Sequence, residues 1–490
     1  MIGMKQTKNN IIIVGGGTAG LISSLILKTR YPKKNITIIK SDKIGIIGVG
    51  EGSTEHFAAF LNYVGINPFD IIKHTDATIK MGVYFENWSK DNYFHQIETD
   101  FINDKIGQYL IRYGYCYSNN IAQTKTSNYS ILNNMVINDK TQSPSNQYHF
   151  NTFKLNEYLS KICKKRNIEI IDDEIKDVIL NDKNEIKNLI GEKKSYDADF
   201  YIDSTGFKKL LISKLGAKWQ SYNRYLKMNE AIAFPTEDTD EYTPYTTATA
   251  MKYGWKWKIP TYGRWGNGYV FCNDYINAEN AQQEVEELLG HKINVAKNIK
   301  FDPGALDKSW IKNCMAIGLS ANFVEPLEAT SIGTSINQIF LFINYFENYC
   351  EKTIEEFNQK MNLIMNNIRD FIILHYIVEK DNSQFWNDIK NIDLPVSLKD
   401  KLDVWKHRLP ILEDFKGTNY YLFFEHNWVS VLYGLKLMNF DSIKKEFSSY
   451  PDYIIEKVKK TVEKYHINIE TMNNISHKLY LTNVRKSDIL

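Results

Sequence analysis

The alternation of apolar and polar stretches predicts strands and helices in turn over the first part of the chain. Residues 10–32, NIIIVGGGTAGLISSLILKTRYP, run from an apolar β-branched stretch through glycines into a helical pattern, which predicts strand, tight turn and helix. The stretch NITIIKSD (35–42) predicts a second strand that closes a β–α–β unit. Further strands are expected at IEIID (168–172), DADFYIDSTG (197–206) and KNCMAIG (312–318), each ending near small residues.

The pattern changes in the last third of the chain. From about Ser335 the apolar residues recur every three or four positions, which predicts helices. We therefore expect residues 1–345 to form an α/β domain with an inserted β-sheet, and residues 346–490 to form a mainly helical subdomain.

Composition narrows the class of protein. A chain of 490 residues with 43% hydrophobic residues can bury a large core in more than one domain, and its formal charge of +2 gives no reason to expect nucleic acid or a membrane as partner. The five cysteines are scattered without metal-site spacing, so we expect no metal and a reduced, cytoplasmic setting. No apolar run has the length of a membrane span, and the N-terminus lacks a signal-peptide pattern.

Gly15, Gly17 and Gly20 form a GxGxxG motif between the first strand and the first helix. The first glycine permits the turn, the second lets a pyrophosphate approach the backbone, and the third lets helix and strand pack closely. The motif predicts dinucleotide binding, and the alternative is a glycine-rich turn without a ligand. The second strand departs from the fingerprint, because Lys40 and Ser41, followed by Asp42, stand where an acidic residue usually contacts the ribose.

Two later stretches favour FAD over a nicotinamide cofactor. DSTG (203–206) ends one strand, and GLSANFVEPLEATSIG (318–333) follows another and leads into a helix. Strand ends that return late in the chain to one site suit a long ligand crossing the sheet. The alternative for each stretch alone is an ordinary strand end.

Several motifs in order resemble those of the flavin-dependent halogenases typified by tryptophan halogenase. They are GGGTAG, GVGEGS (48–53), DATIKMGVYFENW (76–88), DSTGFKKLLI, GWKWKIP, GNGYVF (266–271), GLSANFVEPLEATSIG and HYIVEKDNSQFW (375–386). The resemblance implies a Rossmann-like FAD-binding fold related to glutathione reductase and hydroxybenzoate hydroxylase. It also implies that reduced FAD, oxygen and halide yield hypohalous acid, which halogenates an electron-rich aromatic ring.

The expected cofactor contacts extend beyond the three glycines. We assign to FAD, besides those glycines, Thr18, Ala19, Ser41, Glu51, Ile175, Leu319 and Ile332.

The resemblance gives Trp255, Trp257, Ile259 and Pro260 the role of a wall beside the flavin, which keeps organic substrate away from it. Large rigid side chains exclude volume at little entropic cost. The alternative is that both tryptophans are core residues, and on a strand they would share one face.

Lys80 of ATIKMG is by resemblance the residue that receives hypohalous acid. As an ammonium ion it would polarise the oxidant by a hydrogen bond, and as a neutral amine it would form a haloamine. The alternative is a solvated surface lysine, which the apolar neighbours of Lys80 disfavour.

Glu328 of EPLEATS is by resemblance the second catalytic residue, with Glu325 as a nearby rival. A carboxylate there can orient the oxidant and take the proton from the aromatic ring. The alternative for Glu328 is a first-turn helix residue favoured by the helix dipole.

Halide is expected on backbone amides at Thr330 and Ser331. The family carries Ser-Thr-Gly after its glutamate, whereas this chain has Ala329, Thr330 and Ser331, so the pocket size and the preference among chloride, bromide and iodide stay open.

The substrate is defined only as an indole or phenol in an aromatic-lined pocket. We expect the inserted sheet of the FAD-binding domain 1–345 to lie on the substrate side, and the helical subdomain 346–490 to cover the pocket. Asn419, Tyr420 and Tyr421 resemble a substrate-binding stretch of tryptophan-specific members, but tyrosines in such a segment are more often core residues. The chain shows no separate nicotinamide-binding module after the first GxGxxG motif, so we expect a separate NAD(P)H-dependent flavin reductase as partner. The oligomeric state, a homo-oligomer included, stays open. Rival functions are a flavin-dependent aromatic monooxygenase and a non-catalytic flavin-binding protein.

Overall fold

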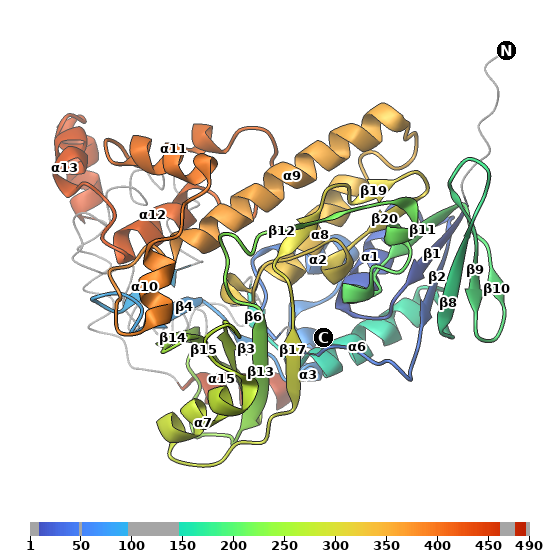
Figure 1. Cartoon of the computed structure of the whole chain (residues 1–490), viewed down its shortest axis with the longest axis horizontal. Helices are drawn as coiled ribbons and strands as arrows, with labels where there is room; N and C mark the ends of the chain where they lie inside the picture. The colour runs from blue at the N-terminus through green and yellow to red at the C-terminus, as the bar shows by residue number, and fades with distance from the viewer. Residues whose placement is uncertain (1–8, 49–50, 97–146, 461–475, 487–490) are drawn as a thin grey trace. The chain divides into compact units, whose positions relative to one another are not determined.

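The computed structural model describes residues 9–48, 51–96, 147–460 and 476–486 (Figure 1). The chain divides into two compact units, each assembled from three separate segments. Unit 1 contains Met1–Thr75, Phe150–Tyr222 and Phe301–Asn366, and unit 2 contains Asp76–His149, Asn223–Lys300 and Asn367–Leu490. The division by role into residues 1–345 and 346–490 stays a prediction.

Unit 1 is built on a six-stranded sheet in the order β19-β20-β11-β1-β2-β7. Its strands are β1 (Asn10–Val14), β2 (Asn35–Lys40), β7 (Glu169–Asp172), β11 (Phe200–Asp203), β19 (Trp310–Ile311) and β20 (Cys314–Ala316). Smaller sheets are formed by β8 (Ile175–Leu180), β9 (Ile186–Gly191) and β10 (Ser195–Tyr196), and by β12 (Trp219–Ser221), β18 (Gly304–Leu306) and β21 (Asn322–Phe323).

The helices of unit 1 follow or link these strands. They are α1 (Thr18–Arg30), α2 (His56–Val64), α3 (Pro68–His74), α6 (Thr152–Lys165) and α8 (Thr330–Phe342), with short 3-10 helices η2 (Gly206–Lys208), η3 (Ile212–Leu215), η4 (Gly318–Ser320) and η5 (Leu327–Ala329). The helix α9 (Glu351–Leu374) begins in unit 1 and ends in unit 2.

The central strands of unit 1 are parallel and apolar. β1 pairs in parallel with β2 on one side and with β11 on the other, and Ile11 to Val14 are all buried. Strands buried on both faces read as continuous apolar runs, which is why the pattern at residues 11–14 identified this strand. Parallel pairing brings the carboxyl ends of β2, β1, β11 and β20 to one edge of the sheet.

Unit 2 contains a seven-stranded sheet in the order β17-β13-β16-β15-β14-β4-β5. Its strands are β4 (Gly82–Glu86), β5 (Tyr93–Gln96), β13 (Glu230–Thr236), β14 (Thr246–Met251), β15 (Gly254–Thr261), β16 (Arg264–Phe271) and β17 (Lys297–Lys300). A separate two-stranded ladder joins β3 (Thr78–Ile79) to β6 (Tyr148–His149). The helices of unit 2 are α7 (Ala278–Leu289), α10 (Gln384–Lys390), α11 (Val396–Trp405), α12 (Glu425–Gly434), α13 (Phe440–Ser448) and α15 (His477–Lys486), with η6 (Leu412–Phe415).

The strands predicted from the sequence are confirmed at β1, β2, β7, β11 and β20, and the predicted helical region is confirmed from α8 onward. The β-sheet of unit 2 is inserted between segments of unit 1, as expected. Among the described residues, no helix is both long and apolar enough to cross a bilayer.

Candidate active site

The glycine turn stands at the carboxyl edge of the unit 1 sheet. Gly15 has a φ of +117°, and a Cβ there would lie 2.1 Å from the carbonyl oxygen of Ser204. A Cβ on Gly20 would lie 2.2 Å from the carbonyl oxygen of Gly15. Only glycine fits either position, because the first needs left-handed backbone and the second needs close contact between helix and strand end.

Gly17 differs from its neighbours because a Cβ there would meet no atom within 4 Å. It is the N-cap of α1, and no side chain caps that helix end. There is therefore space beside Gly17 at the positive end of the α1 dipole, which suits a pyrophosphate. Thr18 donates its hydroxyl proton to Asn156 Oδ1 at 2.8 Å, so its side chain fixes the turn against α6.

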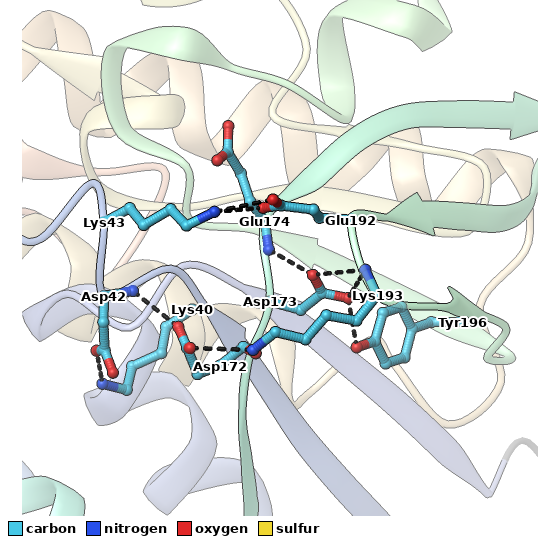
Figure 2. A network of polar contacts seen from close by, with 9 residues as sticks. All are labelled: Lys40, Asp42, Lys43, Asp172, Asp173, Glu174, Glu192, Lys193 and Tyr196. Atoms are coloured by element: carbon cyan, nitrogen blue, oxygen red, sulfur yellow. Dashed lines mark hydrogen bonds and ion pairs between the residues drawn. The ribbon is translucent and has the colours of Figure 1, made fainter.

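The end of β2 carries a network of charges in place of a single acidic residue (Figure 2). Lys40 pairs with Asp42, and the Asp42 amide donates to Asp172 Oδ1 at 2.9 Å. Asp172 stands opposite Lys40 in the β2–β7 register, and Lys193 lies 3.1 Å from its carboxylate. The Asp42 amide and then Lys193 lower the pKa of Asp172. Carboxylates are thus present at this strand end although its last residue is a lysine.

The rest of that network braces the neighbouring hairpin. The Asp173 carboxylate accepts from the amide of Glu174, from the amide of Lys193 and from the hydroxyl of Tyr196 at 2.7 Å. The stem of Lys40 lies against the turn, since a Cβ on Gly16 would be 2.7 Å from Lys40 Cβ. Ser41 follows directly and is half-buried.

Asp203 of the DSTG stretch is a structural anchor at the end of β11. It is fully buried, and its carboxylate accepts from both the amide and the hydroxyl of Thr205, from the amides of Leu211 and Ile212, and from the hydroxyl of Ser320. The last bond ties the strand end to η4, which contains Leu319. The methyl group of Ala19 packs against Gly318 at the start of η4, 2.7 Å from where a Cβ would lie.

Glu328 and Ala329 lie in unusual backbone just before α8. Their φ values are 64° and 54°, so two successive residues with side chains adopt the left-handed region. Such strain persists only where the surrounding structure holds it, often at functional sites. Glu328 is 3% exposed and lies in the short helix η5, directly before α8.

The N-terminus of α8 offers uncapped amides. Ala329 is its N-cap, with no side-chain hydrogen bond, and Thr330 and Ser331 form the first turn. Gln338 of the same helix donates to the Ala316 carbonyl at 2.7 Å, which fixes α8 against the end of β20. The glycine turn, η4 and α8 are thereby held together at one edge of the unit 1 sheet.

Three further residues predicted to contact FAD lie in unit 1. Glu51 is buried, and its carbonyl accepts from the amide of Phe150 at 2.9 Å. Ile332 in α8 is buried, whereas Ile175 lies in the apolar cluster under β8 and β9. Their contacts with FAD stay predictions.

Lys80 lies in unit 2, immediately after β3. It is 1% exposed, so it is not a solvated surface lysine. Its amide donates to the Gln147 carbonyl at 3.1 Å, and the Met81 amide donates to the Pro244 carbonyl at 2.8 Å.

The segment GWKWKIP forms the central strand β15 of the unit 2 sheet. Trp255, Trp257 and Ile259 alternate along the strand and so share one face, and all are buried. A Cβ on Gly268 would lie 2.0 Å from Trp257 Cη2, so a glycine opposite makes the room for this indole. Pro260 falls on the other face, and its carbonyl accepts from the Thr78 hydroxyl at 2.7 Å. Below, the tryptophan wall denotes Trp255, Trp257, Ile259 and Pro260.

The aromatic residues near the C-terminus are packed into unit 2. Trp428 is fully buried against Phe371 and Trp405. Tyr421 donates to the Lys416 carbonyl and contacts Phe424. These positions agree with core residues, as the sequence favoured.

Parallel central strands, a glycine turn, a helix N-terminus without a side-chain cap and a late return of the chain to the same edge are the features expected of a FAD-binding protein. The family model of tryptophan halogenase matches residues 10–445, and the chain belongs to this family. It is a flavin-dependent halogenase. The predicted fold, family and enzyme class are confirmed, and the match favours a halogenase over the rival monooxygenase and flavin-binding protein.

Relatives and solved structures agree with this family. The chain is 30% identical to the 7-chloro-L-tryptophan 6-halogenase KtzR of Kutzneria sp. (strain 744), over 82% of this chain and 86% of the relative. It is 28% identical to the tryptophan 6-halogenase SttH of Streptomyces toxytricini, over 84% and 86%. The structure of a tryptophan halogenase from Shewanella frigidimarina superposes with a TM-score of 0.87 at 25% identity, covering 99% of this chain and 98% of that one.

Proposed function

We propose that this halogenase makes hypohalous acid from oxygen and a halide at reduced FAD, and that Lys80 and Glu328 direct it to an electron-rich indole or phenol. When bound, reduced FAD supplies the electrons: halide, O2, FADH2 and one proton yield hypohalous acid, FAD and water. The hypohalous acid and the aromatic ring then yield the halogenated ring and water.

The observation that carries this proposal is the strained backbone at Glu328 and Ala329. It holds a buried carboxylate directly ahead of the uncapped amides of α8. Helix amides suit a halide ion, and a carboxylate beside them suits a proton acceptor. Thr330 and Ser331 are therefore the proposed halide site.

The other residues supply binding and exclusion. Gly15, Gly17 and Gly20 would hold the FAD pyrophosphate against α1, because the turn leaves space only at the second glycine. The buried Lys80 would donate a hydrogen bond to the oxygen of hypohalous acid and so polarise the O–halogen bond. The tryptophan wall would keep the organic substrate from the flavin.

The proposed substrate class is consistent with the relatives, whose names specify tryptophan. Since Tyr421 is buried and its hydroxyl donates to the Lys416 carbonyl, indole and phenol are proposed alongside tryptophan. We also propose a separate flavin reductase as the source of reduced FAD.

The test is a mass-spectrometric assay with FAD, a flavin reductase, NADH, oxygen and one halide at a time, against L-tryptophan, indole and phenol. We expect halogenated product from the wild type, none from Lys80→Ala, and strongly reduced product from Glu328→Gln. An oxygenated product would identify a monooxygenase instead. Loss of product in Glu325→Gln with retention in Glu328→Gln would transfer the catalytic role to Glu325.

A further inference from the structure

Lys80 directly follows β3, a strand with very few backbone pairs. β3 pairs with β6 through only Thr78 with His149 and Ile79 with Tyr148, and the Lys80 amide continues the ladder to the Gln147 carbonyl. Two paired residues are marginal by themselves, so side chains must fix this strand.

The His149 side chain bridges three elements of unit 2. Its Nδ1 lies 3.2 Å from the Thr78 hydroxyl of β3, and its Nε2 lies 2.8 Å from the Thr246 hydroxyl of β14. The Thr78 hydroxyl in turn donates to the Pro260 carbonyl of β15 at 2.7 Å. The labels β3, β6 and β15 mark these elements in Figure 1.

The donors and acceptors leave one neutral arrangement. A carbonyl only accepts, so the single hydroxyl proton of Thr78 goes to Pro260. The Thr78 oxygen must then accept from His149, which places the imidazole proton on Nδ1. His149 Nε2 is left with its lone pair and accepts from Thr246.

The surroundings keep His149 in that neutral form. Its side chain is fully buried, and burial lowers the pKa of His149 well below its usual range. The positive charge of Lys80 is the second cause and His477 the third, so the imidazole lies close to the catalytic candidate. At neutral pH the hydrogen-bond directions are therefore fixed.

We propose that His149 is a positioning residue for halogenation, which through Thr78 and Thr246 holds the strand of Lys80 against β14 and β15. The distance between Lys80 and the tryptophan wall then stays fixed, because β3, β14 and β15 are joined through these side chains. This inference rests on the roles proposed above for Lys80 and for that wall.

β3 has a second support in the helix α15. The Ile79 amide donates to His477 Nε2 at 3.2 Å, and Tyr480 of the same helix packs against Ile79 and Met81. Because β3 keeps this support and the Lys80–Gln147 bond, loss of His149 should misplace Lys80 without unfolding the unit.

The experiment separates formation of the oxidant from its use. Enzyme with FAD, reductase, NADH, oxygen and bromide is given indole as the probe, with excess monochlorodimedone to trap hypobromous acid that escapes. Brominated indole formed in the presence of the trap reports directed transfer, and the brominated trap reports leakage.

We expect His149→Leu to make hypobromous acid at nearly the wild-type rate but to lower directed transfer about 10- to 100-fold, the loss expected for misplacement of about 1 Å. His149→Asn, whose amide can still donate to Thr78, should recover part of that transfer. Thr246→Val, a nearly isosteric change, should give a smaller shift toward leakage, and it keeps the test available if His149→Leu does not fold. Thr249→Val on the same strand, which loses a bond to Glu86 instead, is the matched control and should behave as wild type.

The outcomes are distinct. An unchanged ratio of brominated indole to brominated trap in both His149→Leu and Thr246→Val would refute the positioning role. A parallel fall of both products would show a merely structural role and would refute it as well. A wild-type enzyme that makes no hypohalous acid with any halide would overturn the proposed function, and this inference with it.

Discussion

Replacing Gly17 and Gly20 by alanine, one at a time, should separate cofactor binding from packing. In Gly17→Ala the new methyl group meets no protein atom within 4 Å, and φ of −75° with ψ of 178° is a conformation that alanine adopts readily. The apo-protein should therefore keep its stability to within about 1 kcal/mol, because the reduced entropy of the unfolded chain offsets the poorer N-cap that alanine makes. The same methyl group would occupy the space left for the pyrophosphate, so FAD should bind at least about tenfold more weakly, or about 1.4 kcal/mol.

Gly20→Ala, in contrast, should lower the stability of the apo-protein as well as its affinity for FAD. Its Cβ would stand 2.2 Å from the Gly15 carbonyl oxygen, so the backbone must move to relieve the clash. Overpacking of this kind typically costs about 1–3 kcal/mol. The apo-protein should unfold at lower urea concentration, and FAD affinity should fall because the turn itself is displaced.

Both variants are measured in two ways: urea unfolding of the apo-protein, and FAD titration followed by quenching of flavin fluorescence. Each variant is the control for the other, since both add one methyl group to the same turn. If Gly17→Ala binds FAD as tightly as wild type, the pyrophosphate does not approach this glycine. If Gly20→Ala unfolds at the same urea concentration as Gly17→Ala, the close packing argument is wrong.

Other positions give equally direct expectations. Burial lowers the pKa of Lys256 to about 8, so the folded protein holds fewer protons than the unfolded chain between about pH 8 and its ordinary pKa, and stability should rise across that window. Lys256→Met should abolish this rise and stabilise the protein at pH 7 by up to about 3 kcal/mol. If the free energy of unfolding, measured with urea, changes with pH equally in both proteins, Lys256 is not the cause of the rise. Asp203→Asn should lower stability by about 1–3 kcal/mol, because its amide group would face hydrogen-bond donors; an unchanged urea midpoint would show that the donors find other partners. Gly268→Ala should displace the Trp257 indole and shift the tryptophan emission of the protein, and an identical spectrum would mean that the sheet yields instead.

The local parts of the site were predictable because they depend on neighbours in sequence. Gly15, Gly17 and Gly20 lie between the end of β1 and the first turn of α1, and the motif alone predicted the turn at Gly15 and the close packing at Gly20. Trp255 and Trp257 share a face because residues two apart on a strand point to the same side, and their spacing in the sequence already predicts this.

What could not be predicted depends on pairing between distant segments. The partner of Lys40 across the sheet is Asp172, which becomes known only once the β2–β7 register is known. The same holds for His149 and Thr78, whose contact requires β3 and β6 to pair. The left-handed backbone at Glu328 and Ala329 had no signal either, since neither residue type favours it.

The interleaving of the two units bears on how the protein is made. The chain passes between units after residues 75, 149, 222, 300 and 366, so no single cut yields either unit as one continuous fragment. On the ribosome, β1 and the glycine turn emerge early, but β20 and α8, which complete that edge of the sheet, follow only after residue 313. Nascent unit 1 therefore exposes apolar strand edges through most of translation, and these are the surfaces that chaperones recognise and that aggregation exploits. Slow synthesis between residues 222 and 300 should lower the yield of soluble enzyme more than slow synthesis after residue 366.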